Sequence, residues 1–480
     1  MDDKLLKLRS VLKTMPLNDN QINNILGIID TQNKEIYDII DTQNKEINDT
    51  IAPLLEQYYS YGIEKDYTNS SPNCIRIGNL DLHRSLPIQS KMRGCLLDDD
   101  GNVVEYLPEN DWTTATRDGS KGQVMVHIPH HYRRFYTKNN NNIICTRISE
   151  LPLKGYHYVP DMFVSAYEAS IEHSSRKLCS VVNYNSDYRG GSNNSDWDET
   201  YRSLLGRPVS EMNRSEFRSA ARKRNASNTS WNCYLYHVHK ALFWLYTIEY
   251  ANLDSQSDYN SELTSDGFHQ GGLGTGISDI DISILNQFND NNPFVPCGHT
   301  DTLGNSTGVV AYTVYNENGL ELKTLNVPRY RGIENLFGHI IKSTDGVNIL
   351  ISPTEDNGGD NLSKVFICED PSKLNDNNYD GYKYVGNEAR INGYVKEIIF
   401  GEEGEIIPSL VGDTSTQYFC DYHSTYIPTT KVLRNVLFGG AANSSNTANG
   451  LLNIITSSTP MFKSTYIGSR LCFIPQQNKN

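Results

Sequence analysis

The sequence predicts an α+β protein with two parts, an N-terminal trimeric coiled coil and a large loop-rich domain. Two observations carry this prediction. Residues 22–55 hold an eleven-residue repeat of isoleucines, which is typical of a helix that packs against other helices. From about residue 68, short β-like runs alternate with turns rich in Asp, Asn and Gly, and two helical segments interrupt them.

The repeat is literal, because Ile29–Ile36 returns letter for letter as Ile40–Ile47. A single helix does not bury such a stripe, and isoleucine at most core positions favours more than two helices. An eleven-residue period indicates a nearly straight or slightly right-handed supercoil. An amphipathic helix packed on its own domain is the alternative. The expected trimerisation residues are Ile22, Ile25, Ile29, Asn33, Ile36, Ile40, Asn44, Ile47, Ile51 and Leu55, with the two asparagines as polar layers.

Residues 1–17 form a separate segment, with leucines at helical spacing and Pro16 at its end. This helix could anchor the chain to a larger assembly, or it could cap the stalk. The stalk is expected over residues 18–58. Asn18 or Asn20 can cap its helix, and Pro53 is expected to interrupt it.

Composition limits the partners. The 480 residues carry a net charge of −14 without a long Lys/Arg run, which argues against nucleic acid. No apolar run approaches the roughly eighteen residues of a membrane span, and Met1–Lys4 precedes no signal-peptide core, so no membrane insertion is expected. The nine cysteines lack CxxC spacing, which predicts reduced thiols in a protein assembled in a cytoplasm. Abundant Asn, Ser and Gly with 30 tyrosines are typical of a recognition protein.

The large domain is expected over residues 68–476, with a leading β-rich part at 68–150 and a core with display loops at 151–476. Glu216–Arg224 is predicted to be a basic amphipathic helix, and Tyr236–Asn252 a buried one. Several segments then form a combined pattern: Gln123–Pro129, Tyr167–Ser170, Phe217–Arg222, Ala241–Asn252, Gly271–Gly274, Tyr330–Gly338 and Ile467–Phe473.

Together these segments resemble fibre and receptor-binding proteins of phages that infect gut Bacteroidetes. The resemblance implies a C-type-lectin-like fold, related to formylglycine-generating enzymes, in which Tyr330–Ile340 and Ile467–Phe473 are scaffold. It implies a homotrimeric tail or head fibre of the virion that contacts other virion proteins through its N-terminal segment. The large domain would bind a host-cell surface receptor, either a glycan or a protein. A purely structural virion decoration protein and a capsule-degrading depolymerase are the alternatives.

The same resemblance implies that the tract between Leu437 and Tyr466 displays the ligand-facing surface. Its small and amide side chains suit adaptable hydrogen bonds, and an aromatic ring can stack on a sugar or peptide. An ordinary solvated loop is the alternative. The predicted ligand-binding residues are Asn443, Ser444, Ser445, Asn446, Asn449, Asn453, Ser457, Thr459 and Tyr466.

Motifs for catalysis and metals are weak. A formylglycine-generating enzyme needs a reactive cysteine pair, but Cys420 and Cys472 are far apart in sequence, and the apolar neighbours of Cys472 should raise its pKa. The loop Gly272–Gly276 lacks the Lys-Ser/Thr of a P-loop. His237 and His239 should point to different faces of their helix. We therefore predict a binding protein with no catalytic residue, metal or cofactor.

Overall fold

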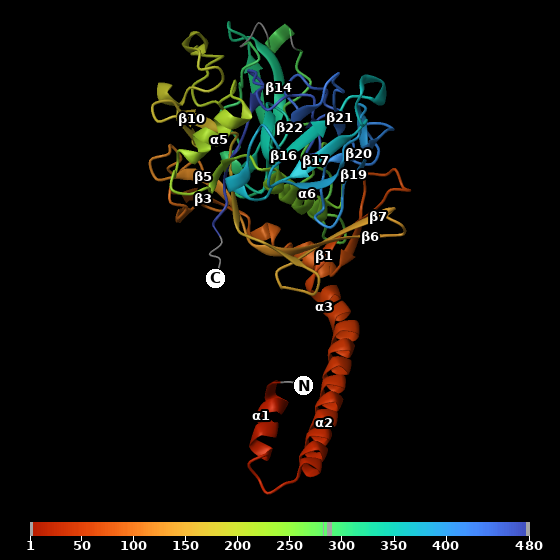
Figure 1. Ribbon diagram of the computed structural model, residues 1–480. Coiled ribbons are helices and arrows are strands. Elements are labelled where there is room, and N and C mark those ends of the chain that lie inside the picture. Colours follow the sequence, from red (N-terminus) through yellow and green to blue (C-terminus); the bar gives the residue numbers. More distant parts are fainter. Residues whose placement is uncertain (1–2, 282, 286–289, 477–480) are drawn as a thin grey trace. The chain divides into compact units, whose positions relative to one another are not determined.

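The structure, a computed structural model, describes residues 3–281, 283–285 and 290–476 (Figure 1). The chain divides into two compact units, Met1–Tyr59 and Ser60–Asn480. Strands account for 29% of the chain and helices for 21%, so the protein is mostly β. The predicted fold class, α+β with a trimeric coiled coil before a C-type-lectin-like domain, is therefore wrong.

One helix of the first unit runs for 41 residues. It comprises α2 (Asp19–Glu46), a π-helical turn (Ile47–Ile51) and α3 (Ala52–Tyr59). Asn18 caps it by accepting a hydrogen bond from the third helical residue, as expected. Pro53 was expected to interrupt the helix and does not. The wider π-helical turn before it relieves the clash between the proline ring and a preceding carbonyl.

A second helix, α1 (Asp3–Leu12), packs on the start of α2 and covers the first turns of the predicted coiled-coil stripe. Ile22 and Leu26 are only 2% and 8% exposed there, whereas Ile36 and Ile47 are 54% and 50% exposed. The other predicted trimerisation residues are exposed or half-buried: Ile25, Ile29, Asn33, Ile40, Asn44, Ile51 and Leu55. The described part of the chain thus holds no long coiled coil. The leucines of α1 supply apolar contacts that the sequence analysis assigned to other chains.

Two sheets of the second unit are built mainly from strands between Tyr61 and Ser165. Their strands are β1 (Tyr61–Asp66), β2 (Ile75–Gly78), β3 (Arg93–Leu97), β4 (Val103–Tyr106), β5 (Gln123–Ile128), β6 (His131–Lys138), β7 (Ile143–Ser149), β8 (His157–Val159), β9 (Met162–Ser165), β12 (Trp231–Cys233) and β25 (Leu471–Phe473). The strand orders are β2-β1-β7-β6-β8 and β12-β25-β9-β5-β3-β4. Because β25 pairs with both β12 and β9, the two ends of this unit meet in one sheet.

A larger sheet is formed by strands from the C-terminal part of the second unit. Its strands are β16 (Ile341–Ile351), β17 (Ser363–Ile367), β18 (Lys383–Asn387), β19 (Gly393–Ile398), β20 (Pro408–Val411), β21 (Tyr422–Ser424), β22 (Val432–Phe438), β23 (Ile454–Ile455) and β24 (Ile467–Gly468). Their order is β18-β17-β16-β22-β23-β21-β19-β20, with β24 parallel to β16. One sheet of the protein curves into a nearly closed, barrel-like form.

Smaller elements complete the unit. A three-stranded sheet holds β13 (Gly308–Tyr315), β14 (Glu321–Tyr330) and β15 (Ile333–Glu334), and β10 (Ser170–Glu172) pairs with β11 (Lys177–Cys179). The unit also contains the helices α4 (Leu80–Ser85), α5 (Arg214–Arg222) and α6 (Tyr236–Tyr250), so both helices expected in this region are present. Short 3-10 turns lie at Gln89–Lys91, Ser186–Tyr188, Ser195–Trp197, Asp301–Leu303, Glu355–Asn357 and Pro371–Lys373.

Helix α6 lies inside the core. Nearly every residue along it is buried, and it contacts β1 and β16. Figure 1 shows it beside the central strand β16. A helix that is buried on nearly all sides needs other elements around it, so the strands pack around α6. Helix α5 differs, since only one of its faces joins a hydrophobic cluster.

Candidate functional site

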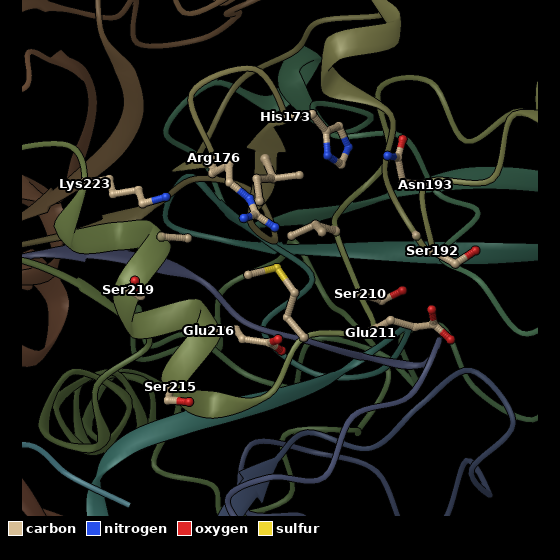
Figure 2. Close-up of a pocket in the computed structure, with 15 residues that line it drawn as sticks. His173, Arg176, Ser192, Asn193, Ser210, Glu211, Ser215, Glu216, Ser219 and Lys223 are labelled. Carbon is tan, nitrogen blue, oxygen red and sulfur yellow. The ribbon is translucent and has the colours of Figure 1, made fainter.

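A cavity of about 680 Å³ opens beside α5 (Figure 2). This volume lies within the range of roughly 300–1,000 Å³ that is typical of small-molecule sites. The apolar lining residues are Ile171, Val209, Met212 and Ala220. The uncharged polar ones are Ser192, Asn193, Ser210, Ser215 and Ser219. The charged or titratable ones are His173, Arg176, Glu211, Glu216 and Lys223.

The local sequence explains how α5 begins and which face it turns to the cavity. Asn213 caps the helix, because its side chain accepts a hydrogen bond from the backbone N–H of Glu216. The Glu216 carboxylate in turn accepts one from the backbone N–H of Asn213. Ser215, Ser219 and Lys223 follow at four-residue steps, so they share one helix face, and all three line the cavity.

Two loops meet on the other side of the cavity. The backbone N–H of Gly191 donates to the carbonyl of Pro208 at 2.8 Å, and that of Ser210 donates to the carbonyl of Gly191 at 3.2 Å. The N–H of Ser192 donates to the side-chain oxygen of Asn292 at 2.7 Å. Gly191 has a φ of +53°, and a Cβ there would strike Asn292, so the position requires glycine. These bonds fix the wall that carries Ser192 and Ser210.

Two basic side chains in the cavity have no acidic partner. Their sequence neighbours do, since Lys177 lies 2.8 Å and Arg224 lies 2.5 Å from the carboxylate oxygens of Asp99. Arg176 and Lys223 form no ion pair within the part of the chain that the structure describes. Figure 2 shows both side chains extending into the cavity. Their charges are therefore free to attract an anionic group.

A buried serine also lines the cavity. Ser210 is 2% exposed, and its Oγ has no hydrogen-bond partner among the described residues. Leaving a buried polar group unsatisfied costs about 1–3 kcal/mol. The Oγ atom itself has less than 1 Å² of accessible surface, so a ligand in the cavity would contact it only after the Ser210 side chain rotates.

The structure separates the predicted ligand-binding residues into two groups. In the first, Asn443 and Ser445 are exposed, and Ser444 and Asn446 are half-buried. The Ser444 hydroxyl accepts a hydrogen bond from the backbone N–H of Ala441 at 3.0 Å, which tightens the turn. The two exposed side chains are the ones that a ligand could reach.

Asn449 and Asn453 close the same loop from inside. They are 0% and 6% exposed. The Asn453 amide donates to the carbonyl of Ala448 at 2.8 Å, and the Asn449 amide donates to the carbonyl of Ala441 at 3.4 Å. In this structure both amides hold the backbone of the tract.

The second group follows β23 in the sequence. Thr459 is exposed, whereas Ser457 and Tyr466 are half-buried. This end of the tract borders the cavity beside α5, because the backbone N–H of Glu211 donates to the carbonyl of Ser464 at 3.0 Å. Ligand binding by the tract stays a prediction. The sequence pattern predicted that α5 is basic and amphipathic, but no pattern predicted the cavity beside it.

A smaller cavity of about 250 Å³ gathers acidic groups, among them Glu369, Glu403 and Glu405. Lys240 Nζ lies 3.0 Å from Glu405 and 3.9 Å from Glu369. Burial by itself would raise the pKa of Glu369, but Lys240 and His237 lower it below its ordinary value. Glycoside hydrolysis needs a carboxyl that stays protonated as the acid. The lowered pKa of Glu369 instead favours its ionised form, so Glu369 does not suit the role of the acid.

Burial also affects the two cysteines considered for catalysis, Cys420 and Cys472. Burial raises the pKa of Cys472 to about 12, and Cys472 lies inside β25. Cys420 is also buried, and burial likewise raises its pKa. The nucleophilic form of cysteine is the thiolate, so neither side chain is activated.

Comparisons with known proteins give no family. No protein-family model matches the chain, and no curated protein matches it significantly. Within the described residues, no three or more His, Cys, Asp or Glu side chains are grouped so that they could hold a metal ion. Across those same residues, no helix has both the length and the apolar character needed to cross a membrane.

Proposed function

We propose that this chain is an attachment protein of a phage virion, which binds a saccharide of the host-cell surface through the cavity beside α5. The observation that carries the binding role is the composition of this cavity. Serine hydroxyls, an asparagine amide and two unpaired cations converge beside apolar side chains, which is the pattern of a recognition site. The virion role rests on the sequence resemblance.

The chemistry of the cavity favours a sugar over an apolar ligand. A sugar ring presents many hydroxyls and one less polar face, and the cavity offers both kinds of contact. The end of the predicted display tract forms part of the same surface through Ser464 and Glu211. A receptor protein is the competing partner, and the test below distinguishes the two.

The first prediction concerns a blocked cavity. Ser219 is exposed on the cavity face of α5, so Ser219→Trp places a large ring in the cavity without disturbing the core. Labelled full-length protein should bind Bacteroidetes cells and their purified surface polysaccharide, and the variant should lose at least tenfold in affinity for both. Ser265→Trp, at an exposed loop position outside the cavity, is the matched control.

Three outcomes oppose the proposal. Unchanged binding by the Ser219→Trp variant would move the site elsewhere. Binding to cells that survives removal of surface polysaccharide would indicate a protein receptor. Wild-type protein that binds neither cells nor polysaccharide would favour a purely structural role in the virion.

A further inference from the structure

We propose that the ligand of the cavity beside α5 is an anionic saccharide, and that Arg176 and Lys223 hold its carboxylate or sulfate group. This inference rests on the proposed function, since it names the class of sugar that the same cavity would take. It adds two residues that were not among the predicted ligand-binding set.

Charge is the first argument. The chain carries 57 acidic and 43 basic residues, with a net charge of −14, so an anionic polymer is repelled by most of its surface. The neighbouring basic residues Lys177 and Arg224 are already in ion pairs, as they share the carboxylate of Asp99. Arg176 and Lys223 are thus a local positive site on an acidic protein, and an anion is the ligand that such a site selects.

The arrangement along α5 is the second argument. Glu216 lies in the first turn and is held there by the capping hydrogen bond. Lys223 comes seven residues later, which is about 10 Å along the helix at 1.5 Å per residue. Figure 2 shows Glu211 on the opposite side of the cavity from Lys223. The cavity therefore has a basic end for an anion and an acidic end whose carboxylates can accept hydrogen bonds from sugar hydroxyls.

The donor geometry is the third argument. An arginine guanidinium presents parallel N–H groups that match a carboxylate or sulfate, and a lysine adds a point charge. Ser219, which is exposed, lines the same cavity and offers a hydroxyl to the ligand. An anionic sugar uses both features at once, since it offers a charged group and neutral hydroxyls on one ring.

The test uses three immobilised polymers and the full-length protein. Polygalacturonate carries carboxylates, dextran sulfate carries sulfates, and dextran is neutral. The double variant Arg176→Ala/Lys223→Ala removes the two unpaired charges. The matched control Lys154→Ala/Lys431→Ala removes the same charge from exposed positions outside the cavity. Equal melting temperatures of the two double variants and the wild type will establish that each protein is folded.

We expect binding to at least one anionic polymer and none to dextran. The cavity variant should bind at least tenfold more weakly, the control should bind like the wild type, and salt should weaken the interaction because it screens exposed charges. The preferred polymer identifies the anion as carboxylate or sulfate. Failure to bind either anionic polymer, or equal loss of binding in both double variants, would overturn the inference.

The two proposals fail in different ways. If Ser219→Trp abolishes cell binding and Arg176→Ala/Lys223→Ala leaves it unchanged, the cavity binds a neutral sugar and only the present inference is wrong. If neither variant changes cell binding, the cavity is not the receptor site and the proposed function is wrong as well.

Discussion

Glu334 is a buried carboxyl whose charge depends on its surroundings. It is 2% exposed and accepts hydrogen bonds from the backbone N–H of Thr300 at 2.7 Å and of Gly298 at 3.1 Å. Burial and the neighbouring Asp301 raise its pKa from 4.5 to about 7, while Arg329 and the bonds from Thr300 oppose this. Glu334 thus attaches the loop at 298–300 to β15, and it titrates near neutral pH.

The stability of the protein should depend on pH through Glu334. Its pKa is higher in the folded than in the unfolded chain, so between pH 4.5 and 7 the folded state binds more protons, and stability falls as pH rises. A rise from 4.5 to about 7 corresponds to about 3 kcal/mol. In melting curves recorded from pH 4 to 8, Glu334→Gln should lose less stability between pH 5 and 7 than the wild type. Equal slopes for the two proteins would refute the assignment.

Among the elements, α1 changes the interpretation of the N-terminal repeat, because it packs on the start of α2. Its residues Leu5 and Leu12 are 8% and 7% exposed against α2, where they cover Ile22 and Leu26. The same leucines were open to two interpretations in the sequence, an anchor or a cap of the following helix. In the structure they pack on the following helix, because two apolar stripes joined by a short connection bury each other.

Removing these leucines should detach α1. The double variant Leu5→Ala/Leu12→Ala loses most of the apolar contact that holds the short helix, so α1 should unfold and expose its backbone to proteases. Limited proteolysis should then cut at Arg9, inside α1, at least several times faster than in the wild type. Val11→Ala is the control, since Val11 is 53% exposed. Equal cleavage rates for both variants would contradict the packing of α1.

At the scale of the whole molecule, the number of chains in the assembly is the property to measure. The homotrimer stays a prediction, with an expected mass of about three times 54.2 kDa. Static light scattering of the full-length protein measures it directly. The triple variant Ile36→Asn/Ile40→Asn/Ile47→Asn is the comparison, and it should have the mass of a monomer. These side chains are 44–54% exposed in the single chain, so they are available for contacts with other chains. A wild-type mass of 54.2 kDa would exclude the trimer.

Local signals predicted local structure well. The Asn18 cap, the amphipathic α5 and the apolar α6 follow from short sequence patterns, since capping and helical periodicity depend on residues within a few turns. The effect of Pro53 was predicted wrongly, because a π-helical turn has no clear sequence signature. The balance of strands over helices also escaped prediction, since many strands here have only two to five residues.

The candidate site also depends on contacts that local sequence patterns do not predict. The sequence placed basic residues at 176, 177, 223 and 224, but it did not show which of them form ion pairs. That distinction depends on Asp99, which is more than seventy residues away from Lys177 and lies beside both partners only in the folded chain. The unpartnered Ser210 hydroxyl is likewise a product of packing.

By itself the sequence determined the long N-terminal helix, the acidic and polar surface, the scattered thiols and the two helices of the large unit. These properties follow from composition and from patterns that repeat within a few residues. The tertiary structure decided that α1 covers the start of the repeat, that strands outweigh helices, and that Arg176, Lys223 and Ser210 share one cavity. The reason is physical: burial and charge pairing depend on contacts between residues far apart in the chain, and only folding establishes those contacts.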